Sequence, residues 1–273
     1  MKDIMIVIPA RYSSSRFPGK PLVKIAGIEM LRRVADIARS ICLKNADCGY
    51  VVATDDERIM AFCQQYDLPV NMTAASCQSG TERAWDVVSQ SAIKPQFVIN
   101  LQGDNPLCPP HVIQALIDQW RTVAADIFTP YIQLSWDEYD RFVQHKKITP
   151  YSGTSVLVNK DHFAMAFSKN ILPAIRQLSE AKKQLSMSPV KRHVGLYGYT
   201  YAALQAYFSL PESLCEKSYI EGLEQMRFLE NGLKVKMVEV DYRGRKTTSG
   251  VDSPDDVARV EQILAEFGEL DLN

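Results

Sequence analysis

The sequence predicts an α/β protein in which a mostly parallel sheet is flanked by helices and carries a smaller inserted lobe. Short apolar runs rich in β-branched residues alternate, over the first half of the chain, with segments whose apolar residues recur every three or four positions. Several of these runs end in polar, glycine-containing loops. Alternating strands and helices favour a parallel sheet, with ligands bound where the strands end.

The regular alternation covers the amino-terminal half. Thr54 or Asp55 is the expected cap of the second helix, and Thr81 is the expected cap of the third. In chain order, we expect strand 4–8, helix 30–41, strand 50–53, helix 58–66, helix 84–88, strand 97–101 and helix 112–123.

The alternation is lost from about residue 130 to 195, which we interpret as a lobe inserted into a single domain spanning 1–273. Within it, 154–158 and 163–167 have the pattern of a hairpin, and 173–189 is polar enough to be mobile. Beyond the lobe we expect strand 194–199, helix 219–231 stopped by Gly232, strand 235–240 and a closing helix that begins at Ser253-Pro254.

Composition limits the kind of partner. The 273 residues carry a net charge of −1 with a pI near 6.4, so neither nucleic acid nor an anionic membrane is attracted by overall charge. The six cysteines are scattered and lack metal-binding spacing, as expected of reduced thiols. The apolar opening is too short for a signal-peptide core, and no apolar run could span a bilayer. We therefore expect a cytoplasmic protein.

The loop after the first strand concentrates positive charge. It contains Arg11, Arg16 and Lys20, three consecutive serines at 13–15, and Gly19 between two prolines. Cations and backbone amides at the end of a buried strand suit a polyphosphate. The alternative is a solvated basic loop. Neither Gly-x-Gly-x-x-Gly nor the P-loop spacing is present, so a phosphate site here depends on side-chain cations.

Two aspartates, Asp104 and Asp252, each follow a glycine turn. Carboxylates from separate loops suit Mg²⁺, which takes one or two protein carboxylates and completes its shell with phosphate oxygens and water. The alternatives are a turn residue for Asp104 and a helix cap for Asp252.

These stretches together resemble the sugar nucleotidyltransferases, which have a Rossmann-like sheet, and most closely the 3-deoxy-manno-octulosonate cytidylyltransferases (CMP-Kdo synthetases). The similarity runs from Ile4 to about Ile263 and includes five motifs in the family's order. The motifs are Pro9-Ala10-Arg11-Tyr12 with Pro18-Gly19-Lys20-Pro21-Leu22, Gln78-Ser79-Gly80-Thr81-Glu82-Arg83, Gln102-Gly103-Asp104, Lys191-Arg192-His193-Val194-Gly195-Leu196-Tyr197 with Leu223-Glu224-Gln225, and Gly250-Val251-Asp252-Ser253-Pro254.

The resemblance implies a role for each motif. Lys20, Asp104 and Asp252 would be catalytic, with both aspartates holding Mg²⁺. The implied nucleotide-binding residues are Pro9, Ala10, Arg11, Arg16, Lys20, Gln78, Ser79, Gly80 and Arg83. The implied sugar-acid residues are Gln102, Lys169, Arg176, His193, Tyr197, Glu224 and Gln225.

The implied activity is transfer of CMP from CTP to a 3-deoxy-ulosonic acid by a homodimer, for lipopolysaccharide or surface-polysaccharide synthesis. Asn105, Ser155 and Lys169 stand where the family usually has Glu, Lys and Arg. These departures favour a modified acceptor such as 8-amino-Kdo, with neutral drift as the alternative. Two other readings stay open: a cytidylyltransferase for a nine-carbon, neuraminate-type acid, and a catalytically silent nucleotide-binding regulator.

Overall fold

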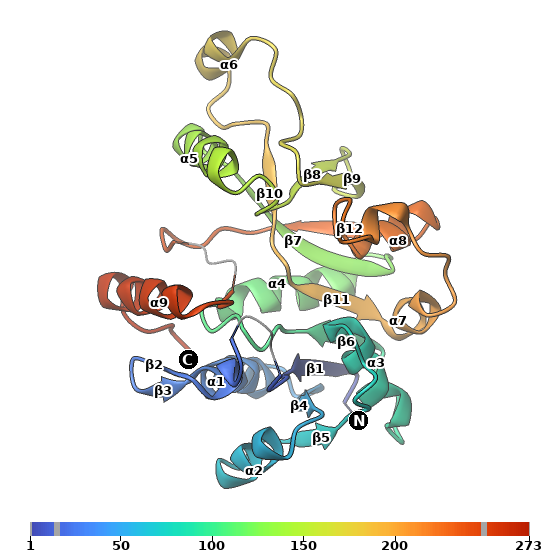
Figure 1. Cartoon of the computed structure of the whole chain (residues 1–273). Coiled ribbons are helices and arrows are strands. Elements are labelled where there is room, and N and C mark those ends of the chain that lie inside the picture. The colour runs from blue at the N-terminus through green and yellow to red at the C-terminus, as the bar shows by residue number, and fades with distance from the viewer. Residues whose placement is uncertain (1, 14–16, 247–249, 273) are drawn as a thin grey trace. The chain divides into compact units, whose positions relative to one another are not determined.

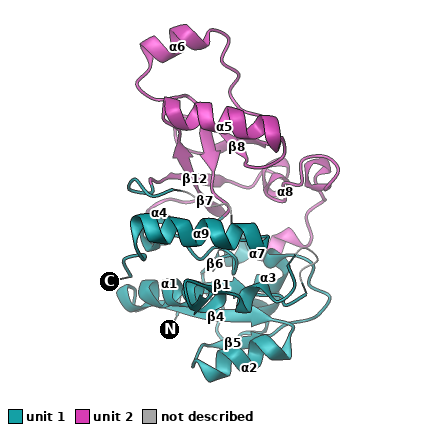
Figure 2. Ribbon diagram, turned by 60° about the vertical axis from the view of Figure 1, so that its left-hand side comes forward, with its two compact units in different colours: residues 1–117, 196–204, 242–273 teal, residues 118–195, 205–241 magenta. Residues whose placement is uncertain are grey.

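A computed structural model describes residues 2–13, 17–246 and 250–272 of the chain. Its contacts divide the chain into two compact units, coloured separately in Figure 2. Unit 1 comprises residues 1–117, 196–204 and 242–273, and unit 2 comprises 118–195 and 205–241. The predicted α/β class is confirmed, because helices flank a sheet with a parallel core (Figure 1).

Unit 1 contains the parallel part of the sheet. β1 (Ile4–Pro9) pairs in parallel with β4 (Cys48–Thr54) on one side and with β6 (Phe97–Asn100) on the other. β5 (Val70–Met72) extends the β4 side in parallel, and β11 (Tyr197–Thr200) pairs antiparallel with β6. β1 is almost entirely apolar and four of its six residues are buried, as the unbroken run of β-branched residues predicts.

The helices of unit 1 follow the predicted order, with two corrected caps. α2 is capped by Asp56, whose carboxylate accepts the Arg58 amide at 2.9 Å, and not by Thr54 or Asp55. α3 is capped by Ser79, whose hydroxyl accepts the Glu82 amide at 3.1 Å, and not by Thr81. The helix bounds are α1 Met30–Lys44, α2 Glu57–Gln65, α3 Gly80–Gln90, α4 Pro110–Thr122 and α9 Pro254–Phe267.

The two ends of the described chain pack together in unit 1. Val260, Ile263 and Leu264 of α9 form a buried cluster with Ile25 and Met30, near the short hairpin of β2 (Lys24–Ile25) and β3 (Ile28–Glu29), and with Leu107 and Val251. The buried Arg33 guanidinium reinforces this packing by binding the Ile25 carbonyl and the Glu269 carboxylate. Helix α9 and the residue Glu269 that follows it are therefore anchored against β2 and the start of α1.

Unit 2 is largely antiparallel. β10 (Lys191–His193) lies between β7 (Ile127–Gln133) and β8 (Ser155–Val158), antiparallel to both. β9 (Ala164–Ser168) forms the predicted hairpin with β8, and β12 (Val235–Glu239) pairs in parallel with β7. The sequence reading missed α5 (Trp136–Ile148), which a Ser135–Glu138 capping box begins, and α7 (Tyr201–Tyr207), which lies across the boundary between the units.

Three expectations for the second half of the chain are corrected. The polar stretch 173–189 contains a helix, α6 (Leu178–Gln184). Helix 219–231 shortens to α8 (Gln225–Glu230), because the chain turns at Gly222, which has a φ of +63°, after the 3₁₀ turn Leu214–Glu216. The strand expected at 194–199 begins only at Tyr197, where β11 starts, and β10 ends before it at His193. Among the described residues, no helix is long and apolar enough to cross a membrane.

Candidate active site

The loop after β1 delivers Lys20 through a tight turn. Gly19 has a φ of +72° and its amide binds the Tyr12 carbonyl at 2.8 Å. A side chain at Gly19 would lie 3.1 Å from the Tyr12 ring, so both the conformation and the close approach favour glycine. The following residues form the 3₁₀ turn η1 (Lys20–Leu22), where Pro21 stiffens the backbone beside the lysine. The lysine side chain is thereby directed from a rigid turn.

Lys20 lies between the two predicted metal ligands. Its Nζ donates to Asp104 Oδ2 at 2.8 Å, to Asp252 Oδ1 at 3.1 Å and to the Val251 carbonyl at 3.0 Å. The lysine side chain is 15% exposed, against 31% for Asp104 and 42% for Asp252. Burial disfavours its charged form, but the two carboxylates outweigh burial and raise the pKa of the Lys20 ammonium.

Two glycines allow the aspartate loops to meet. A Cβ on Gly103 would lie 2.5 Å from the Pro9 carbonyl oxygen, so the turn after β6 can pass over the end of β1 only without a side chain. Gly250 has a φ of +93°, and the next amide, that of Val251, donates to the Asp104 carbonyl at 2.8 Å. This backbone bond joins the two aspartate-bearing loops directly.

Asp252 is not the cap of α9. The Asp256 carboxylate accepts the amides of Asp252 and Ser253, each at 2.9 Å, and the Ser253 hydroxyl at 3.0 Å. Asp256 and Ser253 therefore form the capping box, while the Asp252 carboxylate binds Lys20. The helix-cap alternative for Asp252 is thus replaced by an ionic contact.

Asp104 and Asp252 suit a divalent cation. Both carboxylates already bind one cation, the Lys20 ammonium, so they face a common point. Within 2–13, 17–246 and 250–272, no group of three or more His, Cys, Asp or Glu side chains is placed to hold a metal. A site of two carboxylates fits Mg²⁺ that is completed by phosphate oxygens and water better than it fits a metal held by protein alone.

The remaining nucleotide residues of the sequence reading lie around β1 and α3. Arg11 is exposed, Ala10 is buried with its amide bound to Ala53 at 2.9 Å, and the Gln78 amide donates to Glu82 at 2.6 Å. Arg16 lies outside the described residues.

Arg83 is fully buried, and its guanidinium binds the Asp55 carboxylate at 2.9 Å and the Thr73 hydroxyl. It joins the end of β4 to the chain leading to α3. Its predicted contact with nucleotide stays a prediction.

The predicted sugar-acid residues in unit 2 include a closely placed pair, Lys169 and His193. The His193 ring shares a hydrogen bond of 2.7 Å with the Thr129 hydroxyl and lies edge-on to Phe167. Desolvation, with the positive charge of Lys169 as a second cause, lowers the pKa of His193 to about 3. The imidazole is therefore neutral at pH 7 and offers hydrogen bonds without charge.

Lys169 itself is partly desolvated. Its Nζ donates to the Thr154 hydroxyl at 3.0 Å, and its backbone amide binds the Glu221 carboxylate. Burial lowers the pKa of Lys169, although the negative charge of Glu221 partly opposes the shift.

Ser155, one of the departures from the family pattern, is a buried structural residue. It is 0% exposed, its hydroxyl donates to the Asn170 carbonyl at 2.5 Å and it accepts the Leu172 amide at 3.1 Å. The serine therefore shapes the turn that follows Lys169. Lys146, which the sequence reading missed, donates to the Gly153 carbonyl at 2.7 Å and to the Lys169 carbonyl. Helix α5 thus places the Lys146 ammonium beside this turn.

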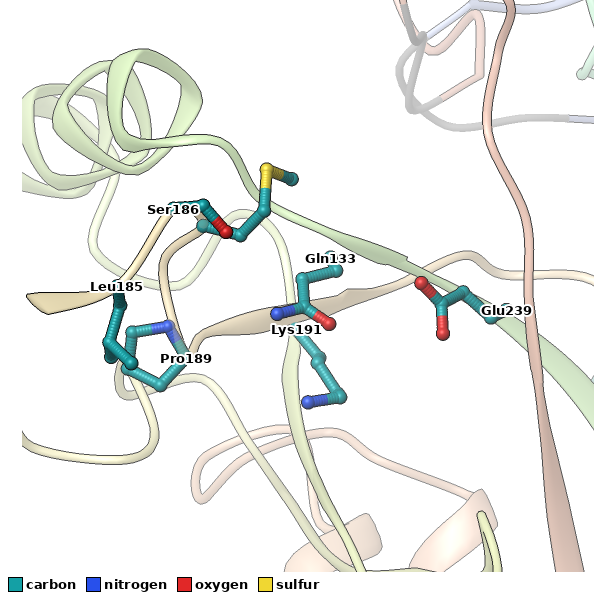
Figure 3. A pocket seen from close by; sticks show the side chains of 7 residues that line it. Gln133, Leu185, Ser186, Pro189, Lys191 and Glu239 are labelled. Carbon is teal, nitrogen blue, oxygen red and sulfur yellow. The ribbon is translucent and has the colours of Figure 1, made fainter.

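The other predicted residues are less closely grouped. In unit 2, Arg176 is exposed, Glu224 precedes α8 and Gln225 is buried at the start of α8. In unit 1, Tyr197 is buried and its ring stacks on that of Tyr199. Unit 2 also has a pocket of about 430 Å³ to which none of the predicted residues contributes (Figure 3). Its lining residues are Gln133, Leu185, Ser186, Met187, Pro189, Lys191 and Glu239.

Comparison with known proteins shows the family to which the chain belongs. A family model described as "Cytidylyltransferase" matches residues 5–237. The 3-deoxy-manno-octulosonate cytidylyltransferase of Maricaulis maris is 42% identical over 98% of this chain and 99% of its own length. The mitochondrial protein of the same name from Arabidopsis thaliana is 34% identical over 95% of this chain and 82% of its own length.

Two solved structures are similar to this chain over nearly its whole length. A CMP:2-keto-3-deoxy-manno-octonic acid synthetase complexed with CTP is 32% identical, with a TM-score of 0.80 over 96% of this chain and 98% of its own. The inositol-1-phosphate CTP transferase from T. maritima shares the fold alone, with a TM-score of 0.57 at 15% identity over 98% of both chains. The chain therefore belongs to the cytidylyltransferase family of nucleotidyltransferase enzymes, among the 3-deoxy-manno-octulosonate cytidylyltransferases.

Proposed function

We propose that this protein transfers CMP from CTP to the anomeric hydroxyl of a 3-deoxy-ulosonic acid and releases pyrophosphate. The observation that carries the proposal is the Lys20 ammonium held between Asp104 and Asp252 at 2.8 and 3.1 Å. The names of the relatives at 34 to 42% identity support the choice of nucleotide and of acceptor class. The product would serve synthesis of lipopolysaccharide or another surface polysaccharide.

Asp104 and Asp252 are the residues that would hold Mg²⁺. When bound, the ion would neutralise phosphate charge and lower the pKa of the attacking hydroxyl. Lys20 competes for the same two carboxylates, so a cation entering this site must displace the ammonium from them. The triphosphate offers Lys20 an alternative anionic partner. Nucleotide and metal are therefore expected to bind together.

The chain's other groups would mainly position the reactants, which is what nucleotidyl transfer asks of a protein. Arg11, Arg16 and Lys20 would neutralise the triphosphate, with Lys20 nearest the leaving pyrophosphate. Arg176 would pair with the sugar carboxylate, while His193 and Glu224 would fix sugar hydroxyls. Because His193 is neutral at pH 7, it would select a hydroxyl by hydrogen bonding rather than by charge.

The acceptor is proposed to be a modified ulosonic acid such as 8-amino-Kdo. Lys169 keeps the charge of the arginine usual in the family but not its planar fork, and Asn105 and Ser155 each lack a charge that is usual in the family. A site built for particular hydroxyls or amines rejects a mismatched substrate strongly, because buried polar groups are left unpaired.

A pyrophosphate-release assay would compare kcat/KM for Kdo, 8-amino-Kdo and a nine-carbon sugar acid, each with CTP. We expect the highest value for 8-amino-Kdo. A clear preference for Kdo would refute the proposal of a modified acceptor but would leave the proposed enzyme class unchanged. If none of the acids in the panel supports pyrophosphate release, the silent nucleotide-binding regulator would be favoured.

The protein is further proposed to act as a homodimer that pairs through the inserted lobe, about 130–195. Support comes from large apolar side chains on this lobe, since Ile148 is 82% exposed, Tyr151 76% and Met165 64%. Leu185 and Met187, which line the pocket of Figure 3, are also exposed. Light scattering should give twice the mass of one chain, and a monomer at assay concentration would contradict the proposal.

A further inference from the structure

Two cysteines lie in contact where α1 leads into β4 (Figure 1). Cys42 is in the last turn of α1, and Cys48 is the first residue of β4. Both are free thiols, and their sulfur atoms are 3.3 Å apart. A disulfide bond is about 2.05 Å long, so the two sulfurs would need to approach by roughly 1 Å to form one.

Hydrogen bonds hold the turn between the two cysteines. The backbone amide and the side-chain Nδ2 of Asn45 both donate to the Ile41 carbonyl, at 3.0 and 2.9 Å, and so end the helix. The Cys48 amide donates to the Asn45 carbonyl at 2.9 Å. Lys2 Nζ donates to the Ala46 carbonyl at 2.9 Å. The backbone therefore keeps the two thiols close together.

The two thiols differ in accessibility and in ionisation. Cys42 is half-buried and is followed by Leu43, which is 82% exposed, whereas Cys48 is 0% exposed. The pKa of the Cys42 thiol is lowered, because the Cys48 S–H can donate to the Cys42 thiolate and this effect outweighs burial. The same hydrogen bond, together with burial, raises the pKa of Cys48. Cys42 is therefore the thiol that can react with a reagent from solution.

Buried cysteines elsewhere in unit 1 have the opposite properties. Cys63 and Cys108 are both 0% exposed, and burial raises the pKa of Cys63 to about 11 and that of Cys108 to about 12. The thiolate is the nucleophilic form of cysteine, so these two thiols are unreactive at pH 7. Cys42 differs from them in its accessibility and in the thiol that it contacts.

We propose that Cys42 and Cys48 form a redox modification site at which hydrogen peroxide produces a reversible disulfide. The Cys42 thiolate attacks one peroxide oxygen, so that an S–O bond forms, the O–O bond breaks and the departing hydroxide takes up a proton to become water. Cys48, the resolving thiol, then attacks the sulfenic sulfur of Cys42. An S–S bond forms, the S–O bond breaks, and the Cys48 proton leaves with the hydroxyl group as a second water. The two thiols lose two electrons, which the peroxide gains.

The disulfide protects Cys42 from further oxidation. A sulfenic acid that meets no second thiol is oxidised onward to sulfinic acid, a product that ordinary reducing agents do not reverse. The site is also separate from the candidate active site. Cys48 pairs with Ile4 at the start of β1, whereas the loop that carries Lys20 follows the end of β1. The proposal therefore does not depend on CMP transfer.

The first test uses the wild-type protein. The reduced chain is treated with about ten equivalents of hydrogen peroxide, alkylated in denaturant and digested with trypsin without reduction. Trypsin cuts after Lys44, so the two cysteines fall in separate peptides, 40–44 and 45–58. We expect these two peptides to be joined to each other and to separate after treatment with dithiothreitol.

The second test removes the resolving thiol. In Cys48→Ala, dimedone should trap Cys42 as a sulfenic acid on peptide 40–44, and without dimedone this peptide should gain about 32 Da as sulfinic acid. Cys77→Ala removes a half-buried thiol of the same unit and is the control. The control should form the joined peptides as wild type does, with about tenfold less dimedone adduct than Cys48→Ala.

Three results would overturn the proposal. The first is recovery of peptides 40–44 and 45–58 from the treated wild type as separate, alkylated peptides. The second is equal dimedone labelling of Cys42 in wild type and in Cys48→Ala. The third is a disulfide that joins two chains, seen as twice the chain mass in denaturant without reducing agent. Because the first test needs no substitution, an unstable Cys48→Ala variant would still leave the proposal open to refutation.

Discussion

Two lysines, one in each unit, lie in environments that differ in charge and that shift the lysine pKa in opposite directions. Lys20 in unit 1 binds two carboxylates, which raise its pKa despite burial. Lys169 in unit 2 donates to a neutral hydroxyl, that of Thr154, and burial lowers its pKa. His193 beside Lys169 is held neutral. Unit 1 thus presents an ionic cluster, whereas unit 2 presents a partly desolvated lysine beside a neutral histidine.

This difference suits two different tasks. Opposite charges at 2.8 to 3.1 Å can exchange partners with a metal and a triphosphate, so the Lys20 cluster is suited to the nucleotide and to the charge that develops on pyrophosphate. The desolvated Lys169 and the neutral His193 can discriminate by hydrogen-bond matching, which suits an acceptor recognised by its hydroxyls or amine. Mutations in unit 1 should therefore act on the rate, and mutations in unit 2 on acceptor recognition.

The largest effect is expected from Asp104→Asn. Loss of one of the two carboxylates should lower kcat about 10³-fold or more, because the metal site loses charge as well as a ligand. The melting temperature should change little, since the Asp104 side chain is 31% exposed. Asp140→Asn, which disrupts a surface ion pair with Lys182, is the control and should keep wild-type turnover. Near-normal activity of Asp104→Asn would show that this carboxylate is not a metal ligand.

Lys20→Gln should lower kcat about 10²-fold at saturating CTP, because the ammonium stabilises charge that moves toward pyrophosphate. It should also strengthen Mn²⁺ binding in the absence of nucleotide, since no ammonium then competes for Asp104 and Asp252. Electron paramagnetic resonance of Mn²⁺ measures this directly. Weaker Mn²⁺ binding in the variant would argue against competition between the lysine and the metal.

Lys169→Met should impair binding of the sugar acid without impairing binding of CTP. The KM for the sugar acid is expected to rise about tenfold, while the KM for CTP stays within a factor of two. Lys182→Met, which removes an exposed lysine of the same unit, should alter neither constant. Equal increases in both KM values would place Lys169 outside a dedicated acceptor site.

The smallest expected effect is the pH dependence from His193. The pKa of its imidazole is about 3 in the folded chain, against about 6.5 for an unperturbed histidine, so between these values the unfolded chain binds a proton that the folded chain does not. Stability is therefore fully present above pH 6.5 and falls as the pH decreases toward 3.

In His193→Asn this proton uptake is absent. Between pH 7 and pH 5, the free energy of unfolding measured with denaturant should fall by about 1 kcal/mol more for wild type than for the variant, after allowance for partial exposure of the ring. Identical slopes against pH for the two proteins would show an ordinary, solvated histidine.

Local signals predicted much of this structure. The β-branched run of β1, the helical stripe of α1 and the Ser253-Pro254 start of α9 are each specified by adjacent residues, and each was confirmed. Caps were less predictable, because Thr54, Asp55 and Asp56 are all suitable and the choice depends on Asp55 being engaged by Arg83 from a distant helix.

In the candidate site, too, local motifs predicted some residues, whereas their contacts depend on the fold. The motifs identified Lys20, Asp104 and Asp252, but their ionic contact depends on residues more than 80 positions apart in the sequence. Lys146 was missed because it binds backbone carbonyls, a role that leaves no sequence pattern.

The most direct test is product analysis with the wild-type protein, CTP, Mg²⁺ and an ulosonic acid, using ³¹P NMR to follow the phosphorus species. We expect equal amounts of pyrophosphate and of a CMP glycoside phosphodiester, with both signals absent when either substrate is omitted. Pyrophosphate formed at the same rate without the sugar acid, or no pyrophosphate with any acid of the panel, would contradict CMP transfer by the Lys20, Asp104 and Asp252 cluster.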